Sequence, residues 1–359
     1  MKMDILLLED HESDIESCKS SLERFHEEHP ENVINLLEAK TPSDAESFFT
    51  NSCYRIEGAI VDLKIGSDQQ AGNGVIAFIN NHNLRIPIII TTGTPDYANQ
   101  DYKYAGVHTK GSFDYAEIFS KFAGIQKTGL YDILGQNGIG ETFLNEIFQK
   151  SIVPYLGKWI DYTQNNSSQD IKRAFMRHIL SHAMEKLDGD FDEFFPEECY
   201  LHKEQTTFPR PGEIFECNTP EGHRQFWCII TPPCDLAMHK DKNGEDFVKV
   251  EHVQLVCIQN LADYRIEYEQ KDGTQTDKQS KHWNKFCKSP DRLYLHFLPP
   301  VSFFQGGFLN FRTVHTVSID VIKKQYTPLD LIISPLFFKN ILANFSSYYS
   351  RQGQPNLKF

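Results

Sequence analysis

Five polar residues of this chain each follow a short apolar run, and their side chains suit the transfer of a phosphoryl group. Glu9 and Asp10 close the segment ILLLED, Asp62 closes GAIVD, Thr92 closes IIITT and Lys110 closes GVHTK. Three carboxylates brought together repel one another, so they favour a divalent cation with oxygen ligands, most simply Mg2+. Such a cation would screen one carboxylate while it attacks a phosphoryl donor. A nearby ammonium would neutralise charge on the transferred oxygens, and a hydroxyl would donate a hydrogen bond to one of them.

Alternating strands and helices in the first 125 residues would bring these side chains together. The apolar runs predict five strands, at 3–8, 33–37, 58–63, 86–92 and 106–110, and amphipathic stretches predict helices at 13–28, 42–49, 74–81 and 114–123. Strands that are apolar on both faces favour a parallel sheet covered by helices. Ligands of such sheets bind beyond the carboxyl ends of the strands, where the five polar residues would converge.

In this order and spacing, the five residues resemble the receiver domain of the response regulators of two-component signalling. The resemblance implies a flavodoxin-like fold for residues 1–125 and makes Asp62 the phosphoacceptor. It implies that Glu9 and Asp10, with Asp62, bind Mg2+, and that the backbone carbonyl of Lys64 completes the metal site. It further implies that Lys110 contacts the phosphoryl group and that Thr92 is the switch hydroxyl. The expected phosphoryl donor is a sensor histidine kinase or a phosphotransfer protein.

Three features depart from the pattern of the receiver family. The polar loop after Asp62, residues 64–73, is longer than usual. Val107 stands where the family usually has an aromatic residue, and Gly111 stands where it usually has a proline in a cis bond. The phosphorylation chemistry is therefore expected to be intact and the signal output unusual. A pseudo-receiver scaffold, which works without phosphorylation, remains an alternative.

A helical pattern occupies the middle of the chain. Apolar residues at helical spacing predict helices over 143–162 and 171–187, a pair that could connect two domains or form a homodimer. His178 and His182 are four residues apart, a spacing able to bind a metal. The sequence offers no obvious third ligand, so a solvated or partly buried pair is favoured.

The last part of the chain has the period of two that is typical of strands. Strands are predicted at 213–217, 225–231, 248–258, 293–298, 307–311 and 314–319, followed by a helix at 335–351. Short strands separated by loops favour a small antiparallel barrel or sandwich. We therefore expect three parts: a receiver at 1–125, a helical connector at 126–195 and a β-rich output domain at 196–359.

Some residues of the β-rich part could carry chemistry of their own. Cys234 follows two prolines and lies beside Asp235 and near His239, which are the residue types of a nucleophilic cysteine site, although a structural turn is the favoured interpretation. A zinc site is a weaker hypothesis, because the spacing of its candidate ligands fits no established pattern; they are Cys199, His202, Cys217, Cys228 and Cys234. The segments GEI, IIT and FRT, the last containing Arg312, are faintly similar to the SH3-like barrels of toxin ribonucleases.

Composition and charge limit the classes of partner. The net charge is -13, and residues 1–125 hold 10 Lys and Arg against 20 Asp and Glu. Nucleic-acid binding is therefore disfavoured, because it depends on a basic surface that neutralises phosphates. No apolar run reaches the roughly 18 to 20 residues of a membrane span, and the eight cysteines lack disulfide-like spacing. We expect a cytoplasmic protein.

The sequence as a whole predicts a response regulator of a two-component phosphorelay. Phosphorylation of Asp62 would control the C-terminal part, most simply through protein interaction, because the sequence contains no helix-turn-helix pattern or glycine-rich phosphate loop. A nuclease-like effector enzyme gated by the receiver is the alternative from another class. Its weak candidate residues are Cys234, Asp235 and Arg312.

Overall fold

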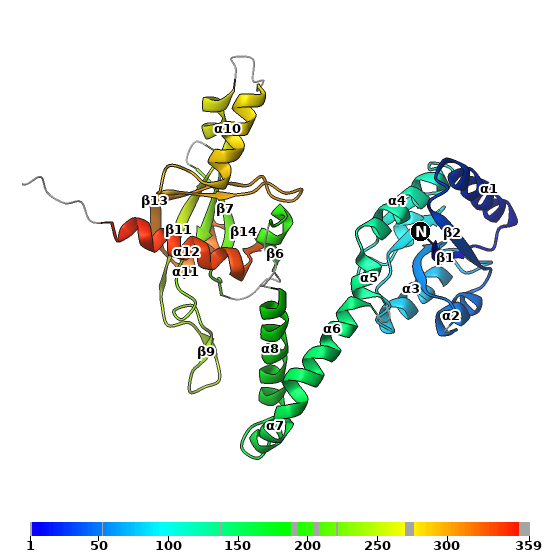
Figure 1. The fold of residues 1–359 in the computed structure, drawn as a ribbon, viewed down its shortest axis with the longest axis horizontal. Coiled ribbons are helices and arrows are strands. Elements are labelled where there is room, and N and C mark those ends of the chain that lie inside the picture. Colours follow the sequence, from blue (N-terminus) through cyan, green and yellow to red (C-terminus); the bar gives the residue numbers. More distant parts are fainter. Residues whose placement is uncertain are drawn as a thin grey trace, which may run out of the picture. The chain divides into compact units, whose positions relative to one another are not determined.

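The computed structural model describes residues 2–51, 53–135, 138–187, 193–203, 208–219, 222–269 and 276–351. Contacts divide the chain into two units, Met1–Asp190 and Phe191–Phe359, whose elements are labelled in Figure 1. The three-part division expected from the sequence stays a prediction. Residues 188–192, at the expected end of the connector, lie outside the described residues. All of the described helices fall short of the length and hydrophobicity that a membrane-spanning helix needs.

The first unit begins with a five-stranded parallel sheet, as the sequence predicts. The strand order is β2-β1-β3-β4-β5, and every neighbouring pair is parallel. The bounds are β1 Lys2–Leu8, β2 Val33–Ala39, β3 Ile56–Val61, β4 Ile88–Thr92 and β5 Gly106–Thr109. This order reverses direction after β1, so the carboxyl ends of β1 and β3 face a crevice at the edge where ligands of such sheets bind. The predicted flavodoxin-like fold is confirmed.

Helices cover both faces of this sheet. The bounds are α1 Glu12–Glu28, α2 Pro42–Thr50, α3 Ala71–Asn81 and α4 Tyr115–Lys127, with a short 3-10 turn, η1, at Pro95–Tyr97. Alternate residues of β1 enter different cores: Ile5 and Leu7 pack with residues of α1 and α4, whereas Leu6 and Leu8 pack with residues of α2 and α3. Burial of both faces explains why the strands are continuous apolar runs.

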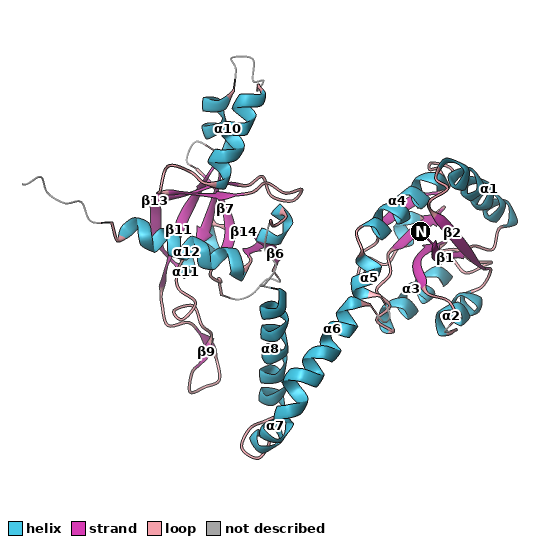
Figure 2. Cartoon of the chain, viewed as in Figure 1, coloured by secondary structure: helices cyan, strands magenta, loops and turns pink. Residues whose placement is uncertain are grey.

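A helical hairpin follows α4. It consists of α5 Leu130–Leu134, α6 Ile139–Ile147, a π-helical turn η2 at Phe148–Ile152, a 3-10 turn η3 at Val153–Tyr155, α7 Leu156–Tyr162 and the returning α8 Ser168–Leu187, as Figure 2 shows. Trp159 joins the two arms, with ring centroids 4.5 Å from Phe175 and 5.6 Å from His178. Apolar packing and a short turn thus hold the arms antiparallel.

Two arginines attach this hairpin to the receiver sheet. Arg55 donates to the carbonyl oxygen of Tyr131 at 3.0 Å, and Arg85 donates to that of Leu134 at 3.2 Å. Both carbonyls belong to α5; that of Tyr131 also accepts from the backbone N–H of Gly135, whereas Leu134 is the last residue of the helix, where carbonyl groups lack helical partners. A guanidinium there also complements the negative end of the helix dipole. The start of the hairpin is therefore fixed to the edge of the receiver opposite the polar residues.

The second unit is an antiparallel half-barrel of seven strands. The strand order is β12-β13-β11-β8-β7-β14-β6, and a separate hairpin pairs β9 with β10. The bounds are β6 Tyr200–His202, β7 Glu213–Asn218, β8 Arg224–Ile229, β9 His239–Lys240, β10 Asp246–Phe247, β11 His252–Gln259, β12 Leu295–Leu298, β13 Gly307–Ser318 and β14 Thr327–Ile333. The predicted mainly-β domain is confirmed. The strands expected at 307–311 and 314–319 form one strand, β13, because its register against β11 shifts at residues 311–313 instead of breaking.

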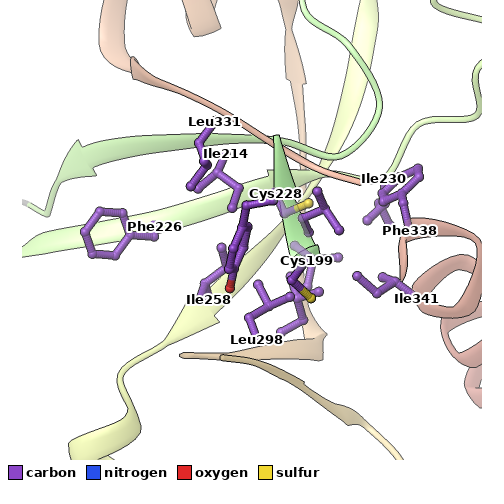
Figure 3. Close-up of a cluster of buried hydrophobic side chains, with 14 of the residues drawn as sticks. Cys199, Ile214, Phe226, Cys228, Ile230, Ile258, Leu298, Leu331, Phe338 and Ile341 are labelled. Carbon is purple, nitrogen blue, oxygen red and sulfur yellow. The ribbon is translucent and has the colours of Figure 1, made fainter. Parts of the chain in front are cut away.

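Helices and a mixed aromatic and aliphatic core complete this unit. The helices are α9 Leu261–Arg265, α10 Asp277–Lys288, α11 Ile319–Gln325 and α12 Pro335–Tyr349, with 3-10 turns η4 at Pro196–Cys199 and η5 at Ile266–Tyr268. In Figure 3, side chains of α12, including Phe338 and Ile341, lie beside strand residues such as Cys228. Burial raises the pKa of the Cys199 thiol to about 12. These buried cysteines therefore pack as neutral apolar groups.

A pair of glycines in α3 tests how tightly the receiver packs around Asp62. A Cβ on Gly72 would lie 2.1 Å from the backbone oxygen of Asp62, whereas a Cβ on Gly74 would meet nothing within 4 Å. We expect Gly72→Ala to destabilise the receiver by about 1–3 kcal/mol. Gly74→Ala should be neutral or stabilising by up to about 1 kcal/mol, because alanine favours the helix. Pulse-labelling hydrogen exchange of β1 peptides across a urea series measures the free energy of unfolding of both variants. Equal changes in that free energy would contradict the close packing of Gly72 against Asp62.

Candidate functional site

The ammonium group of Lys110 lies at the centre of the polar cluster beyond the strand ends. Its Nζ is 2.7 Å from Oε2 of Glu9, 2.7 Å from Oδ2 of Asp62 and 2.7 Å from Oδ2 of Asp14. Glu9 is 1% exposed and Asp62 is 3% exposed. One cation therefore neutralises two buried carboxylates and a third that is partly exposed.

The sheet itself sets this geometry. The backbone N–H of Asp62 donates to the carbonyl of Leu8 at 3.0 Å, which aligns the ends of β3 and β1. The backbone N–H of Lys110 donates to the carbonyl of Thr92 at 2.9 Å, which extends the pairing of β5 with β4 by one residue. The parallel ladder thus continues just past the strands and delivers the polar side chains to one edge.

Burial and ion pairing act in opposite directions in this cluster. Burial raises the pKa of Glu9, and its hydrogen bond and attraction to Lys110 only partly offset that rise. Burial alone would lower the pKa of Lys110, but its hydrogen bonds to Asp14, Asp62 and Glu9 outweigh that effect and raise the pKa above its ordinary value. Lys110 is therefore charged at neutral pH, and Glu9 depends on it to stay ionised.

Asp10 has the one oxygen of the acidic pair that is available to another ligand. Its Oδ2 accepts a hydrogen bond from the backbone N–H of Gly66 at 2.7 Å. Its Oδ1 is buried without a hydrogen-bond partner. An unsatisfied buried carboxylate oxygen is costly unless a cation or water binds it. Beside it, the backbone N–H of Lys64 donates to Oδ1 of Asp62 at 3.1 Å, which places the loop after β3 against the phosphoacceptor candidate.

These acidic residues fit Mg2+ in their chemistry. Asp10, Asp62 and Glu9 supply hard oxygen donors, and the free oxygen of Asp10 is the observation that calls for a cation. Within the described ranges, no group of three or more His, Cys, Asp or Glu side chains is already arranged around a metal position. Lys110 instead binds the oxygens of Glu9 and Asp62. A divalent cation would have to compete with this ammonium.

A small hollow lies beside Asp62, and Thr92 directly precedes Gly93, one of the residues that line it. Thr92 is fully buried, and its hydroxyl oxygen accepts from the backbone N–H of Thr94 at 3.3 Å. The hollow measures about 220 Å3 and is lined by His11, Ser13, Asp14, Asp62, Lys64, Gly93, Thr94 and Lys110. It opens directly on the Asp62 carboxylate and accommodates a group of phosphoryl size.

Two positions that depart from the receiver pattern lie on β5 and in the turn after Lys110. Val107 is exposed on β5. Gly111 has φ of +82°, a left-handed conformation that glycine adopts without strain. No cis peptide bond occurs among the described residues. The turn after Lys110 is therefore built by a glycine and not by a cis proline.

Two features of the site escape the sequence reasoning. Asp14 lies in the first turn of α1 and binds Lys110, although the sequence marks it only as part of a helix start. Gly66 holds Asp10 through a backbone N–H, which no side-chain pattern reports. The position of Asp14, four residues after Asp10 and on a helix that begins beyond β1, is the signal that could have identified it.

The candidate residues of the second unit are engaged in packing or lie on its surface. Arg312 is 3.8 Å from the ring centroid of Tyr294 and donates from Nε to the hydroxyl of Tyr348 at 3.1 Å. Cys234 is exposed, and its thiol is 3.7 Å from Oδ1 of Asp235. The aromatic contacts give Arg312 a structural role in holding α12 to β13.

The cysteines and histidines proposed for metals fall in different environments. Cys199 and Cys228 belong to the core under α12, Cys217 packs beside a second core cluster, and Cys234 is exposed. His178 and His182 contact each other inside the hairpin, with ring centroids 4.5 Å apart. As stated above for the described residues, no cluster of three or more such ligands forms around a metal position.

A cavity in the second unit is a further place where a small molecule could bind. It measures about 640 Å3 and is bordered by α12, β12 and the segment before β6, including Phe194, Phe297, His296, Asn344 and Tyr348. Burial lowers the pKa of His296 to about 4, so this imidazole is neutral at physiological pH. Its Nδ1 lies 3.1 Å from Nδ2 of Asn344.

Comparison with known proteins gives matches only among solved structures. No family model matches the chain, and no curated protein matches it. A response regulator receiver domain protein from Clostridium thermocellum is 20% identical with a TM-score of 0.29, covering 35% of this chain and 98% of that one. A two-component response regulator from Legionella pneumophila is 21% identical with a TM-score of 0.28, covering 35% and 98%. Response regulator protein TrrA from Thermotoga maritima, solved in complex with Mg2+ and BeF, is 21% identical with a TM-score of 0.27, covering 34% and 98%.

The matched structures are response regulator receivers. They match about a third of this chain, its N-terminal part, and the rest is unassigned. Identities this low concern the fold alone, so the role of each residue must be argued from the geometry at the strand ends.

Removal of Lys110 should expose how much the buried acids depend on it. We expect Lys110→Met to destabilise the receiver by about 3 kcal/mol near neutral pH, because Glu9 and Asp62 lose their partner. The pKa of Glu9, already raised by burial, should then rise further. A carboxyl whose folded pKa is raised gains stability as the pH falls, so part of the loss should be recovered near pH 5.

Lys64→Met is the matched control, since it removes the same charge from an exposed side chain near Asp62. It should change stability by less than about 0.5 kcal/mol. Pulse-labelling hydrogen exchange of receiver peptides across urea series, at neutral pH and near pH 5, compares the free energies of unfolding of the two variants. Equal losses in the two variants, or a Lys110→Met loss that does not shrink at low pH, would contradict the electrostatic account.

Proposed function

We propose that this protein is a response regulator whose receiver accepts a phosphoryl group on Asp62. The observation that carries the proposal is the cluster at the strand ends, where Lys110 binds Glu9 and Asp62 and Asp10 keeps a free buried oxygen. A carboxylate nucleophile, oxygen donors for a cation and a fixed ammonium are the parts that phosphoryl transfer to an aspartate needs.

Mg2+ is the proposed cofactor, held by Asp10, Asp62 and the Lys64 carbonyl, with Glu9 nearby. When bound, it would supply positive charge to the phosphoryl oxygens and screen the carboxylates. The transfer step itself involves Asp62.

An oxygen of Asp62 attacks phosphorus, the bond from phosphorus to the donor breaks, and the donor leaves with that electron pair. If the donor is a phosphohistidine of a sensor kinase, the leaving group is the histidine side chain, which takes up a proton and becomes a neutral imidazole.

Lys110 and Thr92 stabilise the product in this proposal. The ammonium of Lys110 lies 2.7 Å from Asp62 and can turn toward a phosphoryl oxygen without leaving the hollow. The hydroxyl of Thr92, now engaged only by the backbone N–H of Thr94, is a donor that a phosphoryl oxygen could attract. Both changes would move the loops after β4 and β5, which is how occupancy of the site reaches the surface.

The proposed output is control of the C-terminal unit through protein interaction. A sensor histidine kinase or phosphotransfer protein is the proposed partner. The eight cysteines are all free in the structure, which supports a reducing cytoplasmic location. The contacts of the exposed Arg312 with Tyr294 and Tyr348 account for this residue without a nuclease-like activity.

The direct test is intact-mass analysis after incubation with acetyl phosphate and Mg2+. We expect a single phosphate adduct on the full chain that is lost on chelation of the metal and absent in Asp62→Asn. An adduct that persists in Asp62→Asn would place the modification elsewhere and overturn the assignment. The absence of any adduct, together with no Mg2+ binding, would support the pseudo-receiver scaffold instead.

A further inference from the structure

The helical hairpin of the first unit carries a row of apolar side chains that its own core does not use. Seven of them are between 42% and 58% exposed: Leu144, Phe148, Val153, Ile160, Met176, Leu180 and Met184. They come from both arms, from α6 to α7 on one side and from α8 on the other. This set is called the outer row below.

Each residue of the outer row directly follows a residue that packs inside the hairpin. Their predecessors, none of which is classed as exposed, are Phe143, Ile147, Ile152, Trp159, Phe175, Ile179 and Ala183. The π-helical turn at Phe148–Ile152 connects α6 to the segment before α7, and the same order of a packed residue followed by an exposed one continues through it. Along both arms, each residue of the outer row therefore comes one position after a residue of the inward-packing set.

This offset places all seven side chains on one side of the hairpin. Successive residues advance about 100° around a helix, always in the same sense. When two helices face each other antiparallel, that rotation carries the next residue of both helices toward the same side. The two arms are antiparallel, as the contacts of Trp159 with Phe175 and His178 require across a short turn. The outer row is thus one continuous face formed by both arms.

The size of this face matches what a dimer needs. Half-exposed apolar side chains contribute roughly 70–100 Å2 each, so the seven expose about 500–700 Å2. A standard interface buries about 800 Å2 per partner, and about 65% of a homodimer interface is apolar, which is about 500 Å2. Two hairpins packed by these faces would complete a four-helix bundle with an apolar interior.

We propose that the outer row is a homodimerisation surface on which the hairpin of a second copy of this chain packs. Leu180, in the middle of the row on α8, and Phe148, on the opposite arm, contribute to the interface. The proposal does not require phosphorylation of Asp62, so its failure and that of the proposed function are distinguishable.

The test is sedimentation equilibrium of the full chain over a dilution series, for the wild type and three variants. Leu180→Glu and Phe148→Glu each bring a charge into the apolar interface and should weaken the dimer at least tenfold. The matched control is Tyr155→Glu, a residue 61% exposed on the same hairpin. Tyr155 follows the exposed Pro154 and so lacks the inward-packing predecessor that defines the outer row, and its variant should leave the dimer unchanged.

Circular dichroism melting of each variant verifies that the hairpin and receiver still fold. A wild-type dimer that is weakened by the two outer-row changes and not by Tyr155→Glu supports the proposal. A wild-type chain that stays monomeric overturns the proposal. In that case another part of the same chain, or a different protein, covers the outer row. A dimer that Leu180→Glu and Phe148→Glu leave intact also overturns it.

Discussion

The rest of the first unit depends on the ion pairs between Lys110 and the carboxylates beyond the strand ends. Glu9 and Asp62 are almost fully buried, and two such charges 2.7 Å from a single ammonium are stable only while that ammonium remains. The parallel ladder, the loop after β3 and the first turn of α1 all serve to hold this arrangement. In the proposed function, this ammonium is the group that a cation would displace from Glu9 and Asp62.

This constraint explains several otherwise unrelated features of the receiver. Gly72 allows the backbone of α3 to lie against Asp62, where a Cβ would clash with the backbone oxygen. Gly66 directs its N–H to Asp10 and leaves the other oxygen of that carboxylate free. Arg55 and Arg85 act at the far edge of the sheet, where they hold α5. The carboxyl ends of the strands thus carry the candidate site, and the opposite edge joins the receiver to the helical hairpin.

Much of the receiver could be predicted from the sequence because its chemistry and its strands coincide. A polar side chain after an apolar run indicates both where a strand ends and which group lies there, so the sheet and the five candidate residues, Glu9, Asp10, Asp62, Thr92 and Lys110, follow from one pattern. Asp14 could not be found this way, since only the folded structure brings the start of α1 over Lys110. Its side chain looks like an ordinary acidic residue in a first helical turn.

The second unit was harder to predict for physical reasons that particular residues illustrate. Strand β14 contains Pro328 and has Asp330 at φ of +53°, so its irregular pairing with β7 hides the strand pattern. Helix α10 is strongly polar, and its capping box at Thr276 and Gln279 was the available signal. Cys199 and Cys228, which suggested a zinc site, are core residues, whereas the nucleophile candidate Cys234 is exposed, and the sequence alone does not separate a buried cysteine from a reactive one.

The measurement that tests the central claim most directly is calorimetric titration of Mg2+ into the full chain and its Lys110→Met and Lys64→Met variants. The account predicts tighter binding in Lys110→Met than in Lys64→Met, because the competing ammonium is gone; equal or weaker binding, or none in the wild type, would contradict it.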